Sequence, residues 1–112
     1  MNFYDNINNL VSAFKKTDEY TSYLELKEQI KKDEKAYNTL KQFKDKQSEV
    51  QMGYLNGQEL SKEVQNEMQN LYSIVIQDDN SRRILELEMK INIMLADIQK
   101  SLGEAVEEIV KF

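Results

Sequence analysis

Residues Ser81–Leu102 read SRRILELEMKINIMLADIQKSL and decide the fold. The apolar residues recur at steps of three and four, which is the period of a helix face rather than of a strand; they are Ile84, Leu87, Ile91, Met94, Leu95, Ile98 and Leu102. A second apolar strip lies beside the first and consists of Leu85, Met89, Ile93 and Ala96. A stripe this wide needs burial on more than one side, so we expect a long central helix over residues 81–111.

The composition is typical of a folded helical protein. The chain has 112 residues, of which 40% are hydrophobic and 31% are charged. It has no proline and only three glycines, so little interrupts helices. We therefore predict an all-α fold, an antiparallel helical bundle of about five helices with long coiled-coil-like members. The length fits one domain, and we expect residues 1–112 to form it.

Short polar residues predict where the N-terminal helices begin. Asp5 is the expected N-cap of a first short helix, because its side-chain oxygen can accept a free backbone N–H. Thr17 is the expected cap of the next segment, with two acidic residues following in the first turn. These short helices are predicted within residues 5–32. The sequence leaves open whether they are separate or form one bent rod.

A long helical hairpin is predicted over residues 33–76. Asp33 is the expected N-cap of its first helix, and Asn56-Gly57 should end that helix because glycine readily adopts the left-handed conformation. Ser61 should cap the return helix, which makes an αα-hairpin with a short turn. The first helix has near-heptad spacing that suits pairing with another long helix, carried by Leu40, Phe43, Val50 and Tyr54.

The charge distribution argues against direct nucleic-acid binding. The net charge is −5; residues 1–56 hold nine basic and nine acidic residues, whereas residues 57–112 hold six and eleven. An acidic protein lacks the electrostatic attraction that phosphate backbones require. Lys31, Lys32 and Lys35 form the one local basic strip, for which a solvated helix face is the simpler interpretation.

The residue types needed for common catalytic and metal chemistry are missing. The chain has neither cysteine nor histidine, which removes thiolate ligands, imidazole ligands and the commonest general base. It also lacks phosphate-binding glycine motifs and nucleophile motifs. Glu104, Glu107 and Glu108 share a helix face and could meet Mg²⁺, but a solvated acidic helix end is the simpler interpretation. We expect no enzyme activity, no cofactor and no metal.

No targeting segment is recognised. The first residues do not combine a basic segment with an apolar core, and no apolar run reaches the roughly 18 residues that span a bilayer. We therefore expect a cytoplasmic protein that does not enter a membrane.

Surplus apolar surface predicts self-association. Helices this long are hard to bury in one small monomer, so a homodimer or a higher oligomer is expected. The proposed interface residues are Ile84, Leu87, Ile91, Met94, Leu95, Ile98, Leu40, Phe43, Val50 and Tyr54. Two questions stay open from the sequence. Arg82-Arg83 opposes the helix dipole and either contacts a partner carboxylate or pairs with Asp78 or Asp79. Met52, Gly53 and Tyr54 either form a docking surface or simply pack.

An ordered set of short segments resembles a known family. The segments are Asn2-Phe3-Tyr4-Asp5, Thr17-Asp18-Glu19-Tyr20, Asp33-Glu34 and Phe43-Lys44-Asp45-x-Gln47. With the order of the later helices, they resemble the YlbF/YmcA-like family of small bacterial helical proteins, within it the YheA-like branch. The resemblance implies an all-helical, often dimeric, cytoplasmic protein. Better-studied relatives act in a complex that supports competence, sporulation and biofilm formation, with links to RNase-dependent mRNA maturation. Some carry Fe–S clusters on cysteines, which this chain cannot do.

Three functions follow, in order of preference. The first is a non-enzymatic oligomeric protein that acts through protein–protein contacts as an adaptor or regulator, with itself or another cytoplasmic protein as partner. The second is an accessory factor associated with RNA processing, which would use the lysines of residues 31–46. The third is a binder of a small molecule or metal through carboxylates and tyrosines.

Overall fold

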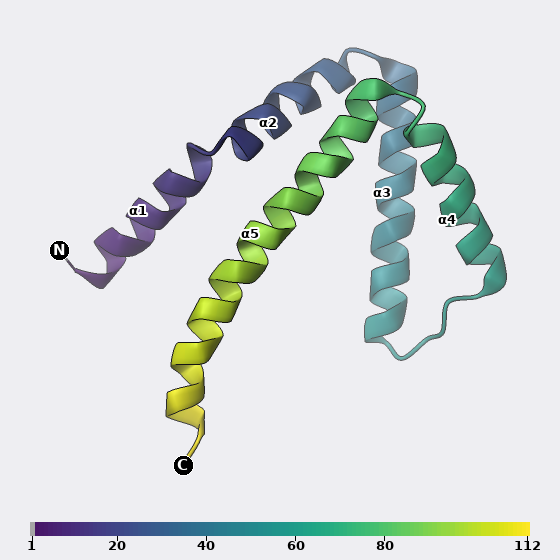
Figure 1. Cartoon of the computed structure of the whole chain (residues 1–112). Helices are drawn as coiled ribbons and strands as arrows, with labels where there is room; N and C mark the ends of the chain where they lie inside the picture. Colours follow the sequence, from purple (N-terminus) through teal and green to yellow (C-terminus); the bar gives the residue numbers. More distant parts are fainter. Residues whose placement is uncertain (1) are drawn as a thin grey trace. The chain divides into compact units, whose positions relative to one another are not determined.

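The computed structural model describes residues 2–112, and every regular element in that range is an α-helix. The five helices are α1 (Phe3–Lys15), α2 (Asp18–Lys31), α3 (Glu34–Leu55), α4 (Lys62–Val75) and α5 (Asp79–Val110) (Figure 1). The predicted all-α class and the number of helices are confirmed.

The chain divides into two compact units. Unit 1 comprises Met1–Leu24 and Leu85–Phe112, and unit 2 comprises Glu25–Ile84. Unit 2 holds the hairpin of α3 and α4 together with the second half of α2 and the start of α5. The expectation that all 112 residues form one domain stays a prediction.

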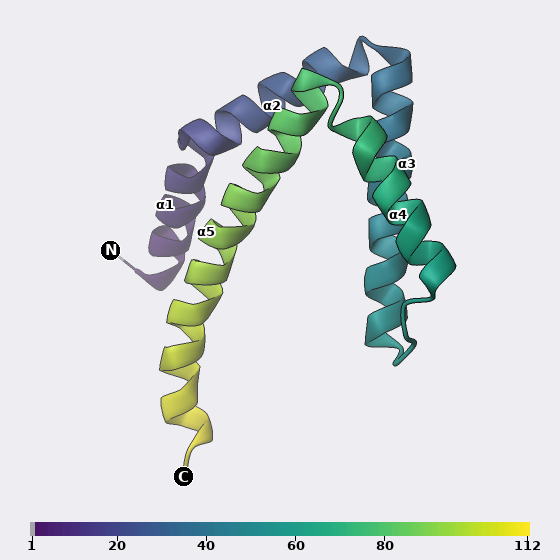
Figure 2. The same ribbon diagram turned by 45° about the vertical axis from the view of Figure 1, so that its right-hand side comes forward.

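The N-terminal helices begin at polar caps, one of which differs from the prediction. Asn2, not Asp5, caps α1, and the backbone N–H of Asp5 donates to Asn2 Oδ1 at 2.8 Å. Asp5 thus lies inside the helix, where its charge still favours the first turn. Thr17 is confirmed as a cap, because the Tyr20 N–H donates to Thr17 Oγ1 at 3.3 Å. The chain changes direction at this point, so α1 and α2 are separate helices (Figure 2).

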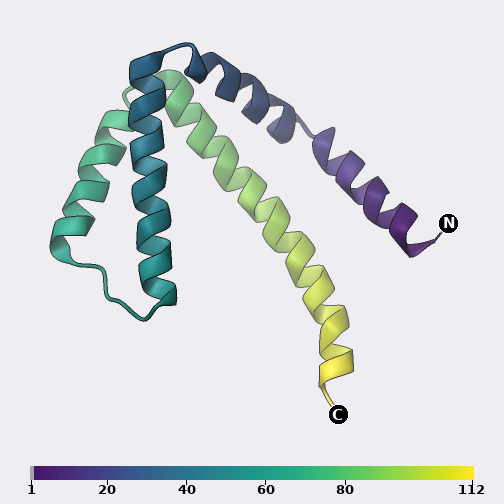
Figure 3. The same cartoon turned by 180° about the vertical axis from the view of Figure 1, so that it is seen from behind.

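Helices α3 and α4 form the predicted hairpin and lie side by side, antiparallel (Figure 3). Asp33 caps α3 by accepting the Ala36 N–H at 3.2 Å, and Ser61 caps α4 by accepting the Val64 N–H at 3.2 Å. Both predicted caps are therefore confirmed.

The end of α3 is a Schellman motif. Gly57 has φ of 78°, its N–H donates to the Tyr54 carbonyl at 3.0 Å, and the Gln58 N–H donates to the Gly53 carbonyl at 2.8 Å. These two bonds satisfy carbonyls that the last turn leaves free. The prediction that Asn56-Gly57 stops the helix is confirmed.

Two glycines in this region should respond to alanine in opposite ways. Gly57→Ala should lower the free energy of unfolding by about 1–2 kcal/mol, because a side chain strains the left-handed backbone. Gly53→Ala should raise it by up to about 1 kcal/mol, because alanine favours helix and its Cβ would meet Gln58 Oε1 at an ordinary 3.5 Å. Urea unfolding measures both, and a loss of stability in both variants would contradict the assigned geometry.

The core of unit 2 gathers side chains from four helices. Its buried apolar residues are Leu26 and Ile30 from α2, Leu40 and Phe43 from α3, Val75 from α4 and Ile84 from α5. Phe43 also contacts the ring of Tyr72, with centroids 5.8 Å apart. This packing fixes the start of α5 beside the hairpin.

Helix α5 is buried only at its start, which corrects the expectation of a central helix. Ser81 and Ile84 are its buried residues, and the remainder is half-buried or exposed. The wide apolar stripe is present in the sequence, but within this chain only its first residues are covered.

The start of α5 also shows which groups one of the two arginines contacts. Asp78 caps the helix by accepting from the Ser81 N–H at 2.9 Å and from Ser81 Oγ at 2.7 Å. Arg82 donates to Asp79 Oδ1 at 3.0 Å and to the Ile76 carbonyl at 3.5 Å. Arg82 therefore offsets its unfavourable place on α5 by pairing with an acid and with the end of α4.

Candidate protein-interaction surfaces

Unit 1 exposes many large apolar side chains. None of the residues that the structure describes in α1 is buried. Its exposed apolar side chains are Phe3, Tyr4, Ile7, Leu10 and Val11, and those of the C-terminal half of α5 are Ile93, Leu95, Leu102, Val106, Ile109 and Val110. Exposed apolar surface on this scale is typical of a protein-interaction site.

A heptad stripe follows the exposed part of α5. Leu95, Leu102 and Ile109 are spaced seven residues apart, and Ile91 and Ile98 occupy the alternate positions. We call these five residues the α5 seam. Leu102 is 61% exposed and Ile109 is 78% exposed. This spacing is what one helix needs to interlock with another along a coiled-coil contact.

The structure distributes the residues proposed as interface over three environments. Leu40, Phe43 and Ile84 are buried in the core of unit 2, and Val50 is half-buried beside the end of the hairpin. Tyr54 and Leu95 are exposed. The others lie half-buried along α5, namely Leu87, Ile91, Met94 and Ile98. Sequence periodicity gave no means of separating core from accessible positions, because both follow the same helical spacing.

One lysine joins the two helices of the hairpin. The Lys46 ammonium of α3 donates to Glu67 of α4 at 2.8 Å and to Glu49 of its own helix at 3.3 Å. These hydrogen bonds, first the one to Glu67, raise the pKa of Lys46 above its ordinary value. The predicted basic region is thus partly neutralised. Lys31 likewise pairs with Glu28 at 3.5 Å.

Removing this lysine should weaken the hairpin at neutral pH. Lys46→Met should lower the melting temperature at low salt, whereas Lys41→Met, an exposed change on the same helix, should not. Because the pKa of Lys46 is raised in the folded state, its ion pairs stabilise the fold fully below the unfolded-state pKa of about 10.4. This stabilisation is lost as the pH rises through the folded-state pKa. The difference between the variants should therefore shrink at strongly alkaline pH. Equal melting temperatures at pH 7 would contradict this role.

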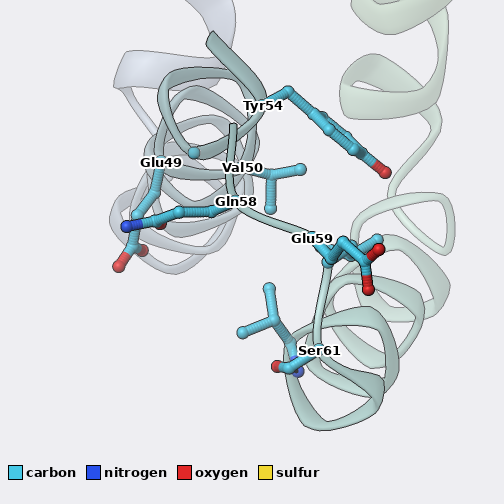
Figure 4. Close-up of a pocket in the computed structure, with 9 residues that line it drawn as sticks. Glu49, Val50, Tyr54, Gln58, Glu59 and Ser61 are labelled. Carbon is cyan, nitrogen blue, oxygen red and sulfur yellow. Dashed lines mark hydrogen bonds between the residues drawn. The ribbon is translucent and has the colours of Figure 1, made fainter. Parts of the chain in front are cut away.

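A pocket lies where the hairpin turns. It has a volume of about 280 Å³ and is lined from α3, the connecting segment and the start of α4. Val50, Leu60 and Val64 give it an apolar base. Polar groups surround them at the rim, and these belong to Glu49, Tyr54, Gln58, Glu59 and Ser61 (Figure 4). We call it the hairpin-tip pocket.

A second pocket of about 260 Å³ is lined by the start of α3, the end of α4 and the start of α5. Its two carboxylates, Asp33 and Asp78, both accept capping hydrogen bonds, and Ser81 donates to Asp78. These groups are already used to begin helices. Within residues 2–112, no three acidic side chains are arranged to hold a metal ion, and no helix is long and apolar enough to cross a membrane.

The arrangement of helices matches a solved structure. A protein of unknown function (DUF964) from Bacillus stearothermophilus superimposes with a TM-score of 0.79, covering 95% of this chain and 93% of that one. The two sequences are only 19% identical, so this similarity shows a shared fold and nothing about function. The class is that of small all-helical proteins.

The sequence comparisons identify the family. Residues 3–107 match the family described as control of competence regulator ComK, YlbF/YmcA. A UPF0342 protein of Desulfitobacterium hafniense is 34% identical over 110 residues, which are 98% of this chain and 89% of the relative. One from Symbiobacterium thermophilum is 35% identical and covers 93% of each chain. The chain therefore belongs to the YlbF/YmcA family, which confirms the resemblance drawn from its short segments.

Proposed function

We propose that this protein is a non-enzymatic cytoplasmic adaptor or regulator, and that it associates with a second copy through the α5 seam. The observation that carries the proposal is the exposed heptad stripe of Leu95, Leu102 and Ile109. A stripe with that spacing fits another helix better than it fits a small molecule. The family description, which refers to control of a competence regulator, supports a role in regulation through protein contacts.

A second copy supplies a matching apolar stripe without any further partner. Most soluble homo-oligomers are closed by a two-fold axis, in which the same patch meets itself. Most positions that flank the α5 seam suit such pairing, because Asn92, Gln99 and Ser101 are uncharged; Glu108, next to Ile109, is the charged exception. Charge at the flanks is therefore confined to the C-terminal end of the seam.

The test is the solution mass by light scattering coupled to size exclusion at two protein concentrations. We expect a mass of at least two chains of 13.2 kDa at both concentrations. A folded monomer at the higher concentration would exclude self-association and would leave the α5 seam for a different protein.

A further inference from the structure

The hairpin-tip pocket is negatively charged and lacks a cation of its own. Glu49 and Glu59 are on its rim, and no lysine or arginine lines it. Glu49 shares Lys46 with Glu67, to which the ammonium lies closer. Within residues 2–112, Glu59 takes part in no ion pair. At least one carboxylate of the rim is thus open to an external cation.

An aromatic ring accompanies that carboxylate. Figure 4 shows the ring of Tyr54 and the carboxylate of Glu59 extending to the same side of the pocket, with Glu49 and Gln58 at the opposite side. Tyr54 is 60% exposed, so the ring is accessible. A guanidinium group can stack on an aromatic face and pair with a carboxylate at once, whereas a lysine ammonium offers a compact charge without a stacking plane.

The size of the pocket restricts the class of ligand further. About 280 Å³ is just below the range of drug-sized ligand sites, so it fits one side chain better than a metabolite.

We propose that the hairpin-tip pocket binds the side chain of an arginine on another protein. The guanidinium pairs with Glu59 and stacks on Tyr54, while its aliphatic stem covers Val50 and Val64. This surface is separate in sequence from the α5 seam. An arginine-bearing partner would give the adaptor role proposed above a binding partner of defined chemistry. The biological use of the pocket rests on that proposed role, whereas the binding itself does not.

Two matched peptides test the proposal on the full-length protein. The probe is acetyl-Leu-Arg-Leu-amide, and its control carries citrulline, which has nearly the same shape without the charge. The readout is the backbone amide spectrum by NMR, where the chain's three glycines give only three glycine signals to assign. We expect the arginine peptide to shift the signals of Gly53 and Gly57 saturably, while that of Gly103 and the citrulline titration stay unchanged.

Point variants then assign the contact. Glu59→Gln and Tyr54→Leu should each weaken peptide binding about two- to fivefold, as expected for an exposed ion pair or a cation–π contact. Glu63→Gln, an exposed change on α4 outside the pocket, should leave it unchanged. The solution mass of the protein should be the same in all three variants. A failure of the peptide-binding proposal is therefore distinguishable from a failure of the proposed self-association.

Several results would overturn the proposal. They are an equal response to the citrulline peptide, unchanged binding in Glu59→Gln, or no saturable shift up to about 10 mM peptide. A different occupant is a second copy through its exposed Arg83. In that case Arg83→Gln, without any peptide, would shift the signals of Gly53 and Gly57 and lower the solution mass.

Discussion

A double substitution of Leu95 and Leu102 by glutamine should leave the protein folded and monomeric. Each leucine contributes about 1.5–3 kcal/mol when its side chain is fully buried, and a two-fold contact loses every substituted side chain twice. Four lost leucines raise the dissociation constant by about 100- to 10,000-fold, even when burial in the contact is incomplete. Light scattering over a concentration series measures the shift.

The matched control places the same new residue on the other side of the helix. Asp97→Gln with Lys100→Gln also leaves the net charge unchanged, and both native side chains are exposed. This control should keep the wild-type mass. Circular dichroism should show the same helix content in both double variants, because glutamine is a good helix former. If both variants keep the wild-type mass, the α5 seam is not the contact.

The sequence predicted helix boundaries better than it predicted burial. Caps depend on local hydrogen bonds, so Thr17, Asp33 and Ser61 were recognisable from residue type and position. The exception, Asn2 in place of Asp5, arises because two short polar residues with cap chemistry stand three positions apart. The local pattern contains nothing that chooses between them.

Burial depends on which face meets a neighbour, and this is not a local property. In α2 the buried residues are Leu26 and Ile30, which are one turn apart. Apolar residues surround much of this helix, so its periodicity selects no single face. A buried serine, Ser81, was also unexpected, because its hydroxyl is accommodated only through the carboxylate of Asp78.

The candidate sites were predicted in part. The sequence indicated an apolar α5 and raised the question of Met52, Gly53 and Tyr54, and the structure shows Met52 and Tyr54 exposed. The hairpin-tip pocket could not be foreseen, because its lining comes from two helices and the segment between them. The Lys46–Glu67 ion pair could not be foreseen for the same reason, because its two residues come from different helices.

Truncation of Leu40 should show that the core of unit 2 holds the fold together. Leu40 is 8% exposed and belongs to the core of unit 2, together with Phe43 of the same helix and Val75 of α4. Leu40→Ala removes buried methyl groups and leaves a cavity, so the free energy of unfolding should fall by about 2–5 kcal/mol. Urea denaturation followed by circular dichroism measures this loss.

Leu55→Ala is the matched control, because it makes the same change near the end of the same helix, where the side chain is 81% exposed. Leucine and alanine have similar helix propensities, so this variant should lie within about 0.5 kcal/mol of the wild type. Burial is the main difference between the two sites, so the contrast measures what packing contributes. Similar losses in both variants would mean that the stability of α3 comes from the helix itself and not from its contacts within unit 2.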